Sequence, residues 1–484
     1  MTSRRLITFG ALAALVTSGT VTLGQQATAK ATPESSLVLY APRHATVYAF
    51  RKQVFFDVPV SLEAIGENFE LWSHRTSYDK PITTELRRGS TVTELPAGLM
   101  DDFTGLSRFF DVTVQNKQGD IVLNRHPTEC LTGDSQRVEP DGAPHSTYPW
   151  GCPDNIFTRG SVQGIAAGWA TSTPLFGYRS VRLPLGRYTM SVTIAATYRA
   201  AFGISDRDAT RTVALKVRKI RQGGPGPGPI PLPIRKPSTD VPHGSVARLA
   251  PADELSSPPG SGPDPDLEAV PAWGIRISKG GNYLQFSATV WNGGDSPLVV
   301  QGFRSGKRGV MDAYQYFYDS AGNQTGYVPA GQMIWDPRKT HHHWHFEDFA
   351  RYRLLDANKH GVARSKKEAF CLANTDMIDY TVPGANWNPD DTDLATSCGD
   401  EDSPAVSEVL ASGSGDTYAQ FRAGQSFSLK GLKNGTYYVS VEANPNSVLT
   451  EQSRTNNTAL RKVRIGGKSG HRTVYVYPVG GITG

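Results

Sequence analysis

The sequence has little of several features that mark common protein classes. Only 4 of its 484 residues are cysteine, 20% are charged, and the 50 Lys and Arg nearly balance the 45 Asp and Glu. The absence of a block of basic residues argues against a nucleic-acid binder that works by counterion release. Beyond the N-terminal region, no apolar run is long enough to cross a membrane as a helix. We therefore expect no nucleic-acid partner and no membrane span.

Glycine and proline are plentiful, with 49 Gly and 33 Pro, which favours turn-rich β structure. Short runs that alternate apolar and polar residues, such as 181–185 and 188–198, are typical of strands. Later runs, such as 284–291, are rich in the β-branched and aromatic residues of strands. The sequence therefore predicts an all-β protein with two β-sandwich-like domains, at residues 36–219 and 269–484.

A Pro/Gly-rich segment at residues 220–268 separates the two expected domains. It includes Gly223-Gly224-Pro225-Gly226-Pro227-Gly228-Pro229 and a second part rich in Ser, Pro and Gly. Such a composition lacks the apolar surface needed to fold, and it is typical of an extended tether. We interpret this segment as a linker.

The first 29 residues resemble an export signal. Arg4 and Arg5 precede an apolar run at 6–21, and Ala27-Thr28-Ala29 fits a cleavage site. The run is short for a membrane span, and the paired arginines resemble a twin-arginine signal. We therefore expect a cleaved signal peptide at residues 1–29 and a secreted, extracellular protein.

Export changes the interpretation of the cysteines, because thiols outside the cytoplasm usually form disulfides. The four cysteines form two local groups on either side of the linker. We predict the bonds Cys130–Cys152 and Cys371–Cys398.

Four of the 11 histidines fall within five positions, at His341, His342, His343 and His345. In a strand, alternate side chains point to the same face, so His341, His343 and His345 would lie together. Three neutral imidazoles suit copper, zinc, nickel or non-haem iron. The alternative is a polar strand whose histidines only form hydrogen bonds, and a bulge would let His342 replace one of the three.

Several motifs around these histidines occur in the order found in one family. His341–His345 and the following Tyr352 to Asn358 resemble H-x-H-x-H and Y-x-L-L-D-A-N. Lys367–Leu372 resembles K-x-x-F-C-L, and Asp416-Thr417-Tyr418 resembles D-T-Y. Residues 435–457 resemble a closing G-x-Y, N-P, E and T-N-N series. Over roughly its last 200 residues, the chain is similar to the lysyl oxidase family.

The resemblance implies a secreted copper-dependent amine oxidase. His341, His343 and His345 would bind Cu²⁺, and Lys367 would be cross-linked to oxidised Tyr418 as a lysine tyrosylquinone. Lysine side chains of proteins or small primary amines would become aldehydes at the expense of O2, with release of H2O2 and NH3. Asp416 would share a strand face with Tyr418 and is our first choice for the proton-abstracting base, with Asp348 second.

The chain also departs from the family pattern. The approach to the histidines, residues 335–339, lacks a cysteine, and fewer disulfides are available than in animal relatives. Residues 444–457 are also similar to adhesion-type β-sandwich modules. The alternative function is therefore a non-catalytic extracellular metal-binding sandwich for adhesion or binding. For capture of a lysine-rich partner, the sequence offers local acidic groups at Asp390-Asp391 and at 400–402.

Overall fold

The structure is a computed structural model that describes residues 35–50, 53–56, 58–175, 180–219, 262–304, 307, 309–338, 342–365, 369–392, 394–422 and 424–482. In these residues there are thirty-two strands, two short α-helices and one 3-10 turn, which confirms the all-β prediction. The expected signal peptide and residues 220–261 of the expected linker lie outside the described residues. Among the described helices, none has the length and apolar character needed to cross a membrane.

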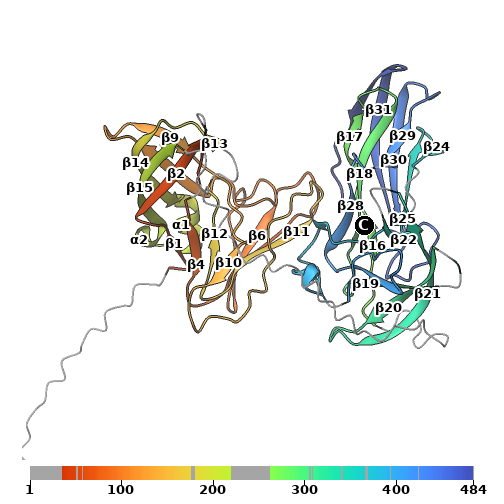
Figure 1. Cartoon of the computed structure of the whole chain (residues 1–484), viewed down its shortest axis with the longest axis horizontal. Coiled ribbons are helices and arrows are strands. Elements are labelled where there is room, and N and C mark those ends of the chain that lie inside the picture. Colours follow the sequence, from red (N-terminus) through yellow and green to blue (C-terminus); the bar gives the residue numbers. More distant parts are fainter. Residues whose placement is uncertain are drawn as a thin grey trace, which may run out of the picture. The chain divides into compact units, whose positions relative to one another are not determined.

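The first module, from residue 35 to 219, has three sheets in its described part (Figure 1). One has the order β1-β4-β12-β10, namely Leu37–Tyr40, Ser61–Ala64, Trp169–Ser172 and Ser135–Arg137. Another has the order β11-β5-β6-β7, namely Gly160–Ile165, Phe69–His74, Thr83–Arg88 and Thr91–Glu94. The largest has the order β13-β3-β2-β15-β14-β8-β9, namely Ser180–Val181, Gln53–Phe55, His44–Phe50, Thr210–Lys219, Gly186–Ile194, Phe110–Gln115 and Ile121–Arg125. Helices α1 (Ala196–Phe202) and α2 (Asp206–Ala209) separate β14 from β15.

The described part of the second module also has three sheets. One contains β16-β18-β28-β26 with β17 and β29 beside β18, namely Leu267–Ala269, Tyr283–Asn292, Ser414–Tyr418, Asp376–Met377, Trp273–Ile277 and Ser426–Ser428. Another has the order β25-β22-β21-β20-β19-β27, namely Ala369–Phe370, His343–Glu347, Gln324–Asp336, Val310–Tyr318, Leu298–Arg304 and Ala405–Leu410. The last has the order β24-β23-β30-β31-β32, namely Gly361–Arg364, Ala350–Leu355, Gly435–Ala443, Thr458–Lys468 and His471–Val476. The 3-10 turn η1 spans Pro389–Asp391.

Strand β16 places ordered structure slightly earlier than the expected start of the second domain. Leu267 pairs with Asn292 of β18, and its neighbours continue the ladder to Ala269. Leu267 is also fully buried in the core of this module. The last residues of the expected linker, 267 and 268, therefore belong to the β-sheet.

The closing motif at 435–457 has a structural role. Asn444 donates from Nδ2 to the Glu451 carboxylate at 2.6 Å, and Asn457 donates to the same oxygen at 2.9 Å. The other Glu451 oxygen accepts the backbone N–H of Leu267 at 3.2 Å. Burial raises the pKa of Glu451. These contacts fasten the first strand of the module to the β30–β31 connection.

In both modules, a tyrosine near the start of a long strand is hydrogen-bonded to the turn before that strand. The Tyr188 hydroxyl donates to the carbonyl of Pro184 at 2.9 Å, and the Tyr437 hydroxyl donates to that of Lys433 at 2.7 Å. Each bond spans four residues and closes the turn that leads into β14 or β30, as in the tyrosine corners of β-sandwiches. Residues 186–192 and 435–441 share the sequence pattern G-x-Y-x-x-S-V, which therefore marks equivalent local structures.

Candidate active site

The histidine segment forms strand β22, which pairs with β21 on one side and β25 on the other. Alternation along this strand buries Trp344 and Phe346 completely in the core. His343 and His345 lie on the opposite face, and His345 is only 3% exposed. Their Nε2 atoms are 2.9 Å apart. The strand therefore brings two imidazoles to one point, as alternation predicts.

The imidazole pair fits a metal site. Two nitrogens each about 2.0–2.1 Å from one metal ion and at right angles are about 2.9 Å apart. Nδ1 of His345 lies 3.5 Å from the Asp336 carboxylate, which favours a proton on Nδ1 and leaves Nε2 as the metal-binding nitrogen. A hydrogen bond between two neutral rings would have the same Nε2 separation. The Asp336 carboxylate also accepts hydrogen bonds from Arg338, at 2.8 and 2.9 Å, so the contact with His345 fits either arrangement.

The remaining histidines of the cluster behave differently. Strand β22 begins at His343, and exposed His342 has φ +49°, in the left-handed region. The uninterrupted alternation that we expected from His341 onward is therefore broken at His342. His341 itself lies outside the described residues. Within the part of the chain that the structure describes, no three His, Cys, Asp or Glu residues gather as a metal site.

Both predicted disulfides are present, and the second adjoins the histidine strand. Cys130 is bonded to Cys152, and Cys371 is bonded to Cys398. The carbonyl of Cys398 accepts the backbone N–H of Trp344 at 2.8 Å. The Cys371–Cys398 bond thus connects the histidine strand to the segment after β25.

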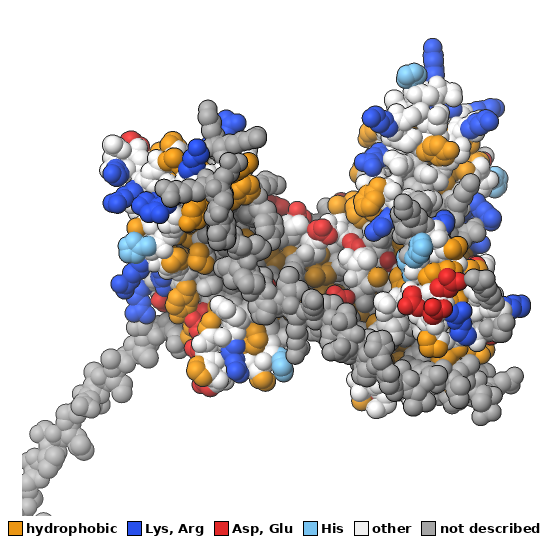
Figure 2. Space-filling view, viewed as in Figure 1, with side chains coloured by type: hydrophobic (Ala, Val, Ile, Leu, Met, Phe, Trp, Pro, Cys, Tyr) orange, Lys and Arg blue, Asp and Glu red, His pale blue; other side chains and the backbone are white. Residues whose placement is uncertain are grey.

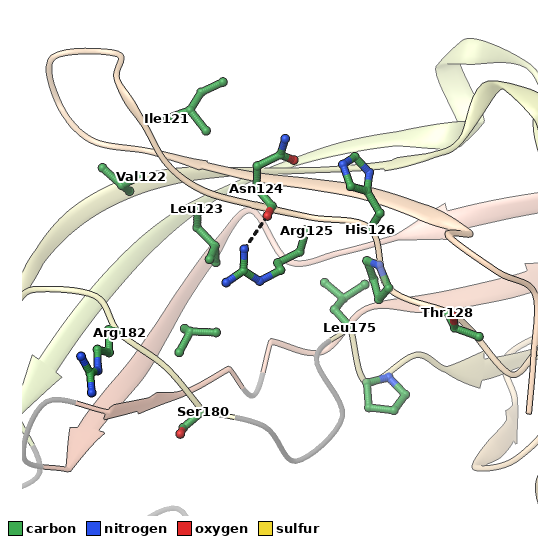
Figure 3. A pocket seen from close by; sticks show the side chains of 13 residues that line it. Ile121, Val122, Leu123, Asn124, Arg125, His126, Thr128, Leu175, Ser180 and Arg182 are labelled. Carbon is green, nitrogen blue, oxygen red and sulfur yellow. Dashed lines mark hydrogen bonds between the residues drawn. The ribbon is translucent and has the colours of Figure 1, made fainter. Parts of the chain in front are cut away.

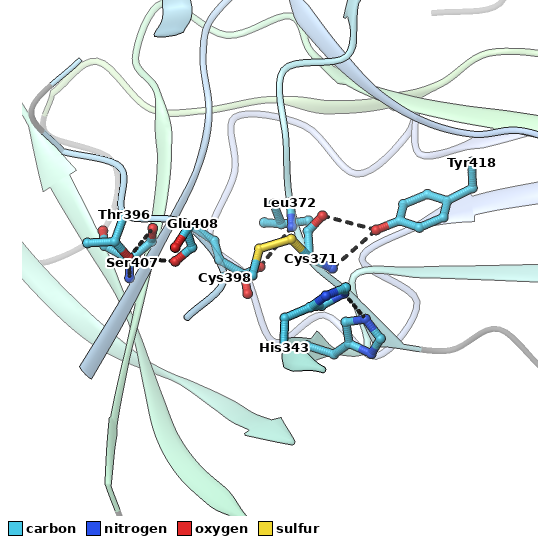
Figure 4. Close-up of a disulfide and its surroundings, with 10 residues drawn as sticks. His343, Cys371, Leu372, Thr396, Cys398, Ser407, Glu408 and Tyr418 are labelled. Atoms are coloured by element: carbon cyan, nitrogen blue, oxygen red, sulfur yellow. Dashed lines mark hydrogen bonds between the residues drawn. A yellow bond between two sulfur atoms is a disulfide. The ribbon is translucent and has the colours of Figure 1, made fainter. Parts of the chain in front are cut away.

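The phenol of Tyr418 is held by the backbone of the same cysteine (Figure 4). Its hydroxyl donates to the carbonyl of Cys371 at 3.0 Å and accepts the N–H of Cys371 at 3.1 Å. The Tyr418 ring meets that of Phe370 edge to face, with 4.9 Å between centroids. In Figure 4, the Tyr418 hydroxyl points toward the backbone of Cys371, and His343 lies below the Cys371–Cys398 disulfide. Tyr418 is therefore hydrogen-bonded to one cysteine of the disulfide, and the histidine strand is hydrogen-bonded to the other.

Buried acids surround the phenol. Burial raises the pKa of Tyr418 well above its ordinary value, and the charges of Asp416 and Glu408 add to this effect. Asp416 lies two residues before Tyr418 on β28 and is 3% exposed. The phenol is consequently protonated at neutral pH.

For two other residues predicted from the sequence, Lys367 and Asp348, the structure gives less information. Lys367 lies outside the described residues, between Ser365 and Ala369, which are both described. Asp348 follows β22, with φ +60° and partial burial.

Two site residues, Glu408 and Asp336, do not stand out in the sequence. Glu408 is 1% exposed, and its Oε2 accepts the N–H of Leu372 at 2.9 Å. A single acid in the apolar run Ala405–Leu410 was the available signal. Asp336 offered only its position before Pro337, because its proximity to His345 depends on pairing between β21 and β22.

A separate open hollow of about 1070 Å³ lies in the first module (Figure 3). It is bordered by β9 and β13, the two edge strands of the seven-stranded sheet, and its charged groups include Arg125, His126 and Arg182. Arg125 donates to the carbonyl of Asn124, and His126 is paired with Asp111. The hollow shares no residue with the histidine strand.

Comparison with known proteins agrees with the motif evidence. Residues 314–475 match the family model for lysyl oxidase. The chain is 30% identical to human protein-lysine 6-oxidase over 135 residues, and 29% identical to the chicken protein over the same length. Each match covers 28% of this chain and 28% of the relative. The matched region includes the histidine strand and Tyr418, and the C-terminal module of this chain therefore belongs to the lysyl oxidase family.

Proposed function

We propose that this protein is a secreted copper-dependent amine oxidase. The reaction is R-CH2-NH2 + O2 + H2O giving R-CHO + NH3 + H2O2. The bound copper and the tyrosine-derived quinone would together accept two electrons from the amine and pass them to O2. The observation that supports this best is that the Cys371–Cys398 disulfide links the two parts of the site. The backbone of Cys371 holds the Tyr418 phenol, and the carbonyl of Cys398 accepts the N–H of Trp344, which lies between the two histidines.

The metal would be held by His343 and His345, with His341 as the third proposed ligand. The described pair offers two Nε2 atoms at a separation that suits ligands of one ion. Asp336 would keep the proton of His345 on Nδ1 and hold the ring in place. Imidazole nitrogens suit copper, and the family match favours copper over zinc.

The quinone would be built from Tyr418 and Lys367. Cys371 fixes the phenol oxygen through two hydrogen bonds, and Phe370 contacts the edge or face of its ring. Lys367 precedes Cys371 by four residues, and four residues span at most about 14 Å. Chain connectivity alone thus limits how far the lysine can be from the tyrosine.

Asp416 is our proposed proton-abstracting base. It shares strand β28 with Tyr418, and alternation places residues two apart on the same face. Its electrostatic effect on the Tyr418 pKa also implies proximity. A buried carboxylate beside the reacting carbon would take the proton on one of its oxygens while the amine loses two electrons.

The substrates we propose are lysine side chains of proteins or small primary amines, both cationic. The acidic loop Asp400-Glu401-Asp402 lies next to the histidine strand, because the Trp344 indole N–H donates to the carbonyl of Asp400 at 2.8 Å. Such a loop would attract an ammonium group toward the site.

The alternative, a metal-binding sandwich without catalysis, also accounts for the closing motif. Asn444, Glu451 and Asn457 fasten strands together, so their presence does not distinguish an enzyme from an adhesion module. The presence of both Tyr418 and Lys367 favours the enzyme, because a non-catalytic sandwich does not need this pair.

The test is peroxide release from a primary amine by the full chain after Cu²⁺ loading, together with quinone absorbance. Tyr418→Phe should abolish both signals, because the phenol oxygen is lost while the ring still contacts Phe370. Lys367→Arg should also abolish them, because Arg cannot form the cross-link.

Tyr437→Phe is the matched control, since it removes another hydroxyl from the same module at a structural position. It should retain peroxide release. Copper binding without peroxide or quinone in the wild-type chain would refute the enzyme and leave the non-catalytic alternative.

A further inference from the structure

The five-stranded sheet of the second module is strongly basic. Strands β24, β23, β30, β31 and β32 contain eight Lys and Arg but a single acid, Glu442. The whole chain has a net charge of only +5. In Figure 2, blue side chains surround the upper part of the second module, where Figure 1 labels β31, β30 and β24. Positive charge is therefore concentrated on this sheet.

Strand β31 directs two of these cations to solvent. Lys462 and Arg464 are exposed, whereas Val463 and Ile465, which alternate with them, are buried in the core. Side chains two apart on a strand are about 6.6–6.8 Å apart. Among the described residues, no carboxylate forms an ion pair with either cation.

Tyrosines lie beside these cations on the same face. Arg464 is paired across the strands with Tyr475, which is 59% exposed. Lys462 is paired with Tyr438, and its ammonium lies 4.7 Å from the centre of the Tyr477 ring. The Tyr475 and Tyr477 rings are nearly perpendicular, with centroids 4.9 Å apart. The outer face thus combines exposed aromatic rings with cations.

The one acid of the sheet is occupied elsewhere. The Glu442 carboxylate accepts hydrogen bonds from Arg351 at 2.9 Å and from Arg353 at 3.0 Å. It therefore neutralises part of the charge on β23 and leaves that of Lys462 and Arg464 on β31.

We propose that this face binds an acidic polysaccharide. Tyrosine rings offer flat apolar surfaces for the C–H faces of sugars, and the cations would pair with carboxylate or sulfate groups. Binding to duplex DNA by counterion release depends on neutralising several phosphates, and this face offers two cations almost 7 Å apart. A polymer with one charge per sugar or per disaccharide matches this spacing better. A lysine-rich protein would be repelled, so the face is distinct from the amine site.

The probe is alginate, which carries one carboxylate per sugar, with neutral dextran as the reference. Binding of the full chain would be measured by biolayer interferometry at several salt concentrations. The wild type should bind alginate and not dextran, with affinity that decreases as salt increases. A Lys462→Gln/Arg464→Gln variant should bind about tenfold more weakly, since each lost charge contributes part of about 1.4 kcal/mol. Tyr475→Ala should weaken binding with little change in salt dependence.

The matched control is Arg187→Gln/Lys216→Gln, which removes a cross-strand cation pair of the first module. It should bind as the wild type does, and thermal unfolding should show that all variants are folded. Absent alginate binding, unchanged binding by the β31 double variant, an equal loss in the control, or tighter binding to duplex DNA than to alginate would each overturn the proposal. Peroxide release from a small amine should be unchanged in the β31 variant, so a failure here is separable from failure of the proposed oxidase function.

Discussion

The two modules share a way of building strands but differ in what they bury around them. Tyr188 in the first module and Tyr437 in the second close equivalent turns with a bond to a carbonyl four residues earlier. Each module also contains one disulfide between residues fewer than 30 apart in sequence. In the described residues, the second disulfide adjoins the histidine strand, Tyr418 and buried Glu408, whereas the first adjoins one buried acid, Glu129.

The disulfide and the tyrosine corner occur in both modules, so they stabilise the fold. The proposed function depends on the side chains that are held beside the second disulfide. Burying His345, Glu408 and Asp416 costs solvation free energy, as does burying Glu129 in the first module. Hydrogen bonds compensate part of that cost, such as the one from Leu372 to Glu408.

The largest effect should come from the histidine pair. His343→Ala or His345→Ala removes one of two converging nitrogens, so copper affinity should decrease by at least about 100-fold. Losing a group that only orients a metal ligand already costs about 10–100-fold. Titration with Cu²⁺ followed by metal analysis measures this. His126→Ala in the first module, where His126 is paired with Asp111, should leave copper binding unchanged. Wild-type copper content in both site variants would remove these residues from the metal site.

Removing either disulfide should lower stability, but only removal of the second should also affect the proposed quinone. Their loops span 22 and 27 residues, so replacing either pair by serine should cost roughly 3 kcal/mol of unfolding free energy. Urea unfolding measures that cost. Only Cys371→Ser/Cys398→Ser should also reduce quinone absorbance, because the disulfide fixes the Cys371 backbone, whose N–H and carbonyl hold the Tyr418 hydroxyl. An equal loss of quinone in the Cys130→Ser/Cys152→Ser variant would contradict a local role for the second bond.

The smallest effect should come from the tyrosine corners. Tyr437→Phe should lower the free energy of unfolding by about 1 kcal/mol, the usual net value of a hydrogen bond. Tyr188→Phe should cost less, because its hydrogen bond is exposed to solvent. Neither change should alter copper binding. A loss of copper in Tyr437→Phe would show that the corner and the site are coupled.

Much of the local structure could be predicted from the sequence. The alternation of His343, Trp344 and His345 predicts two opposite faces, and the structure has the indole in the core with the imidazoles on the other side. Cysteine spacing also predicted both disulfides. Strand alternation depends only on neighbouring residues, and each cysteine has one partner on its own side of the linker. Both features can therefore be predicted from the residue pattern.

Other parts of the site could not be predicted in this way. Strand alternation does not predict the left-handed conformation of His342, because the backbone angles at the end of a strand depend on the turn before it. The near-neutral net charge of the whole chain did not predict the basic face. Lys462 and Arg464 lie beside tyrosines only when β30, β31 and β32 are in register.

By itself, the sequence determined the β-strand periodicity, the disulfide pairs and the likeness of the last 200 residues to lysyl oxidases, because each is written in residue type and spacing. Only the tertiary structure decided that Asp336 lies beside His345 and that Cys371 holds the Tyr418 phenol. The physical reason is that hydrogen bonds act over about 3 Å between residues up to 47 positions apart, and chain order carries no information about that distance until the strands pair.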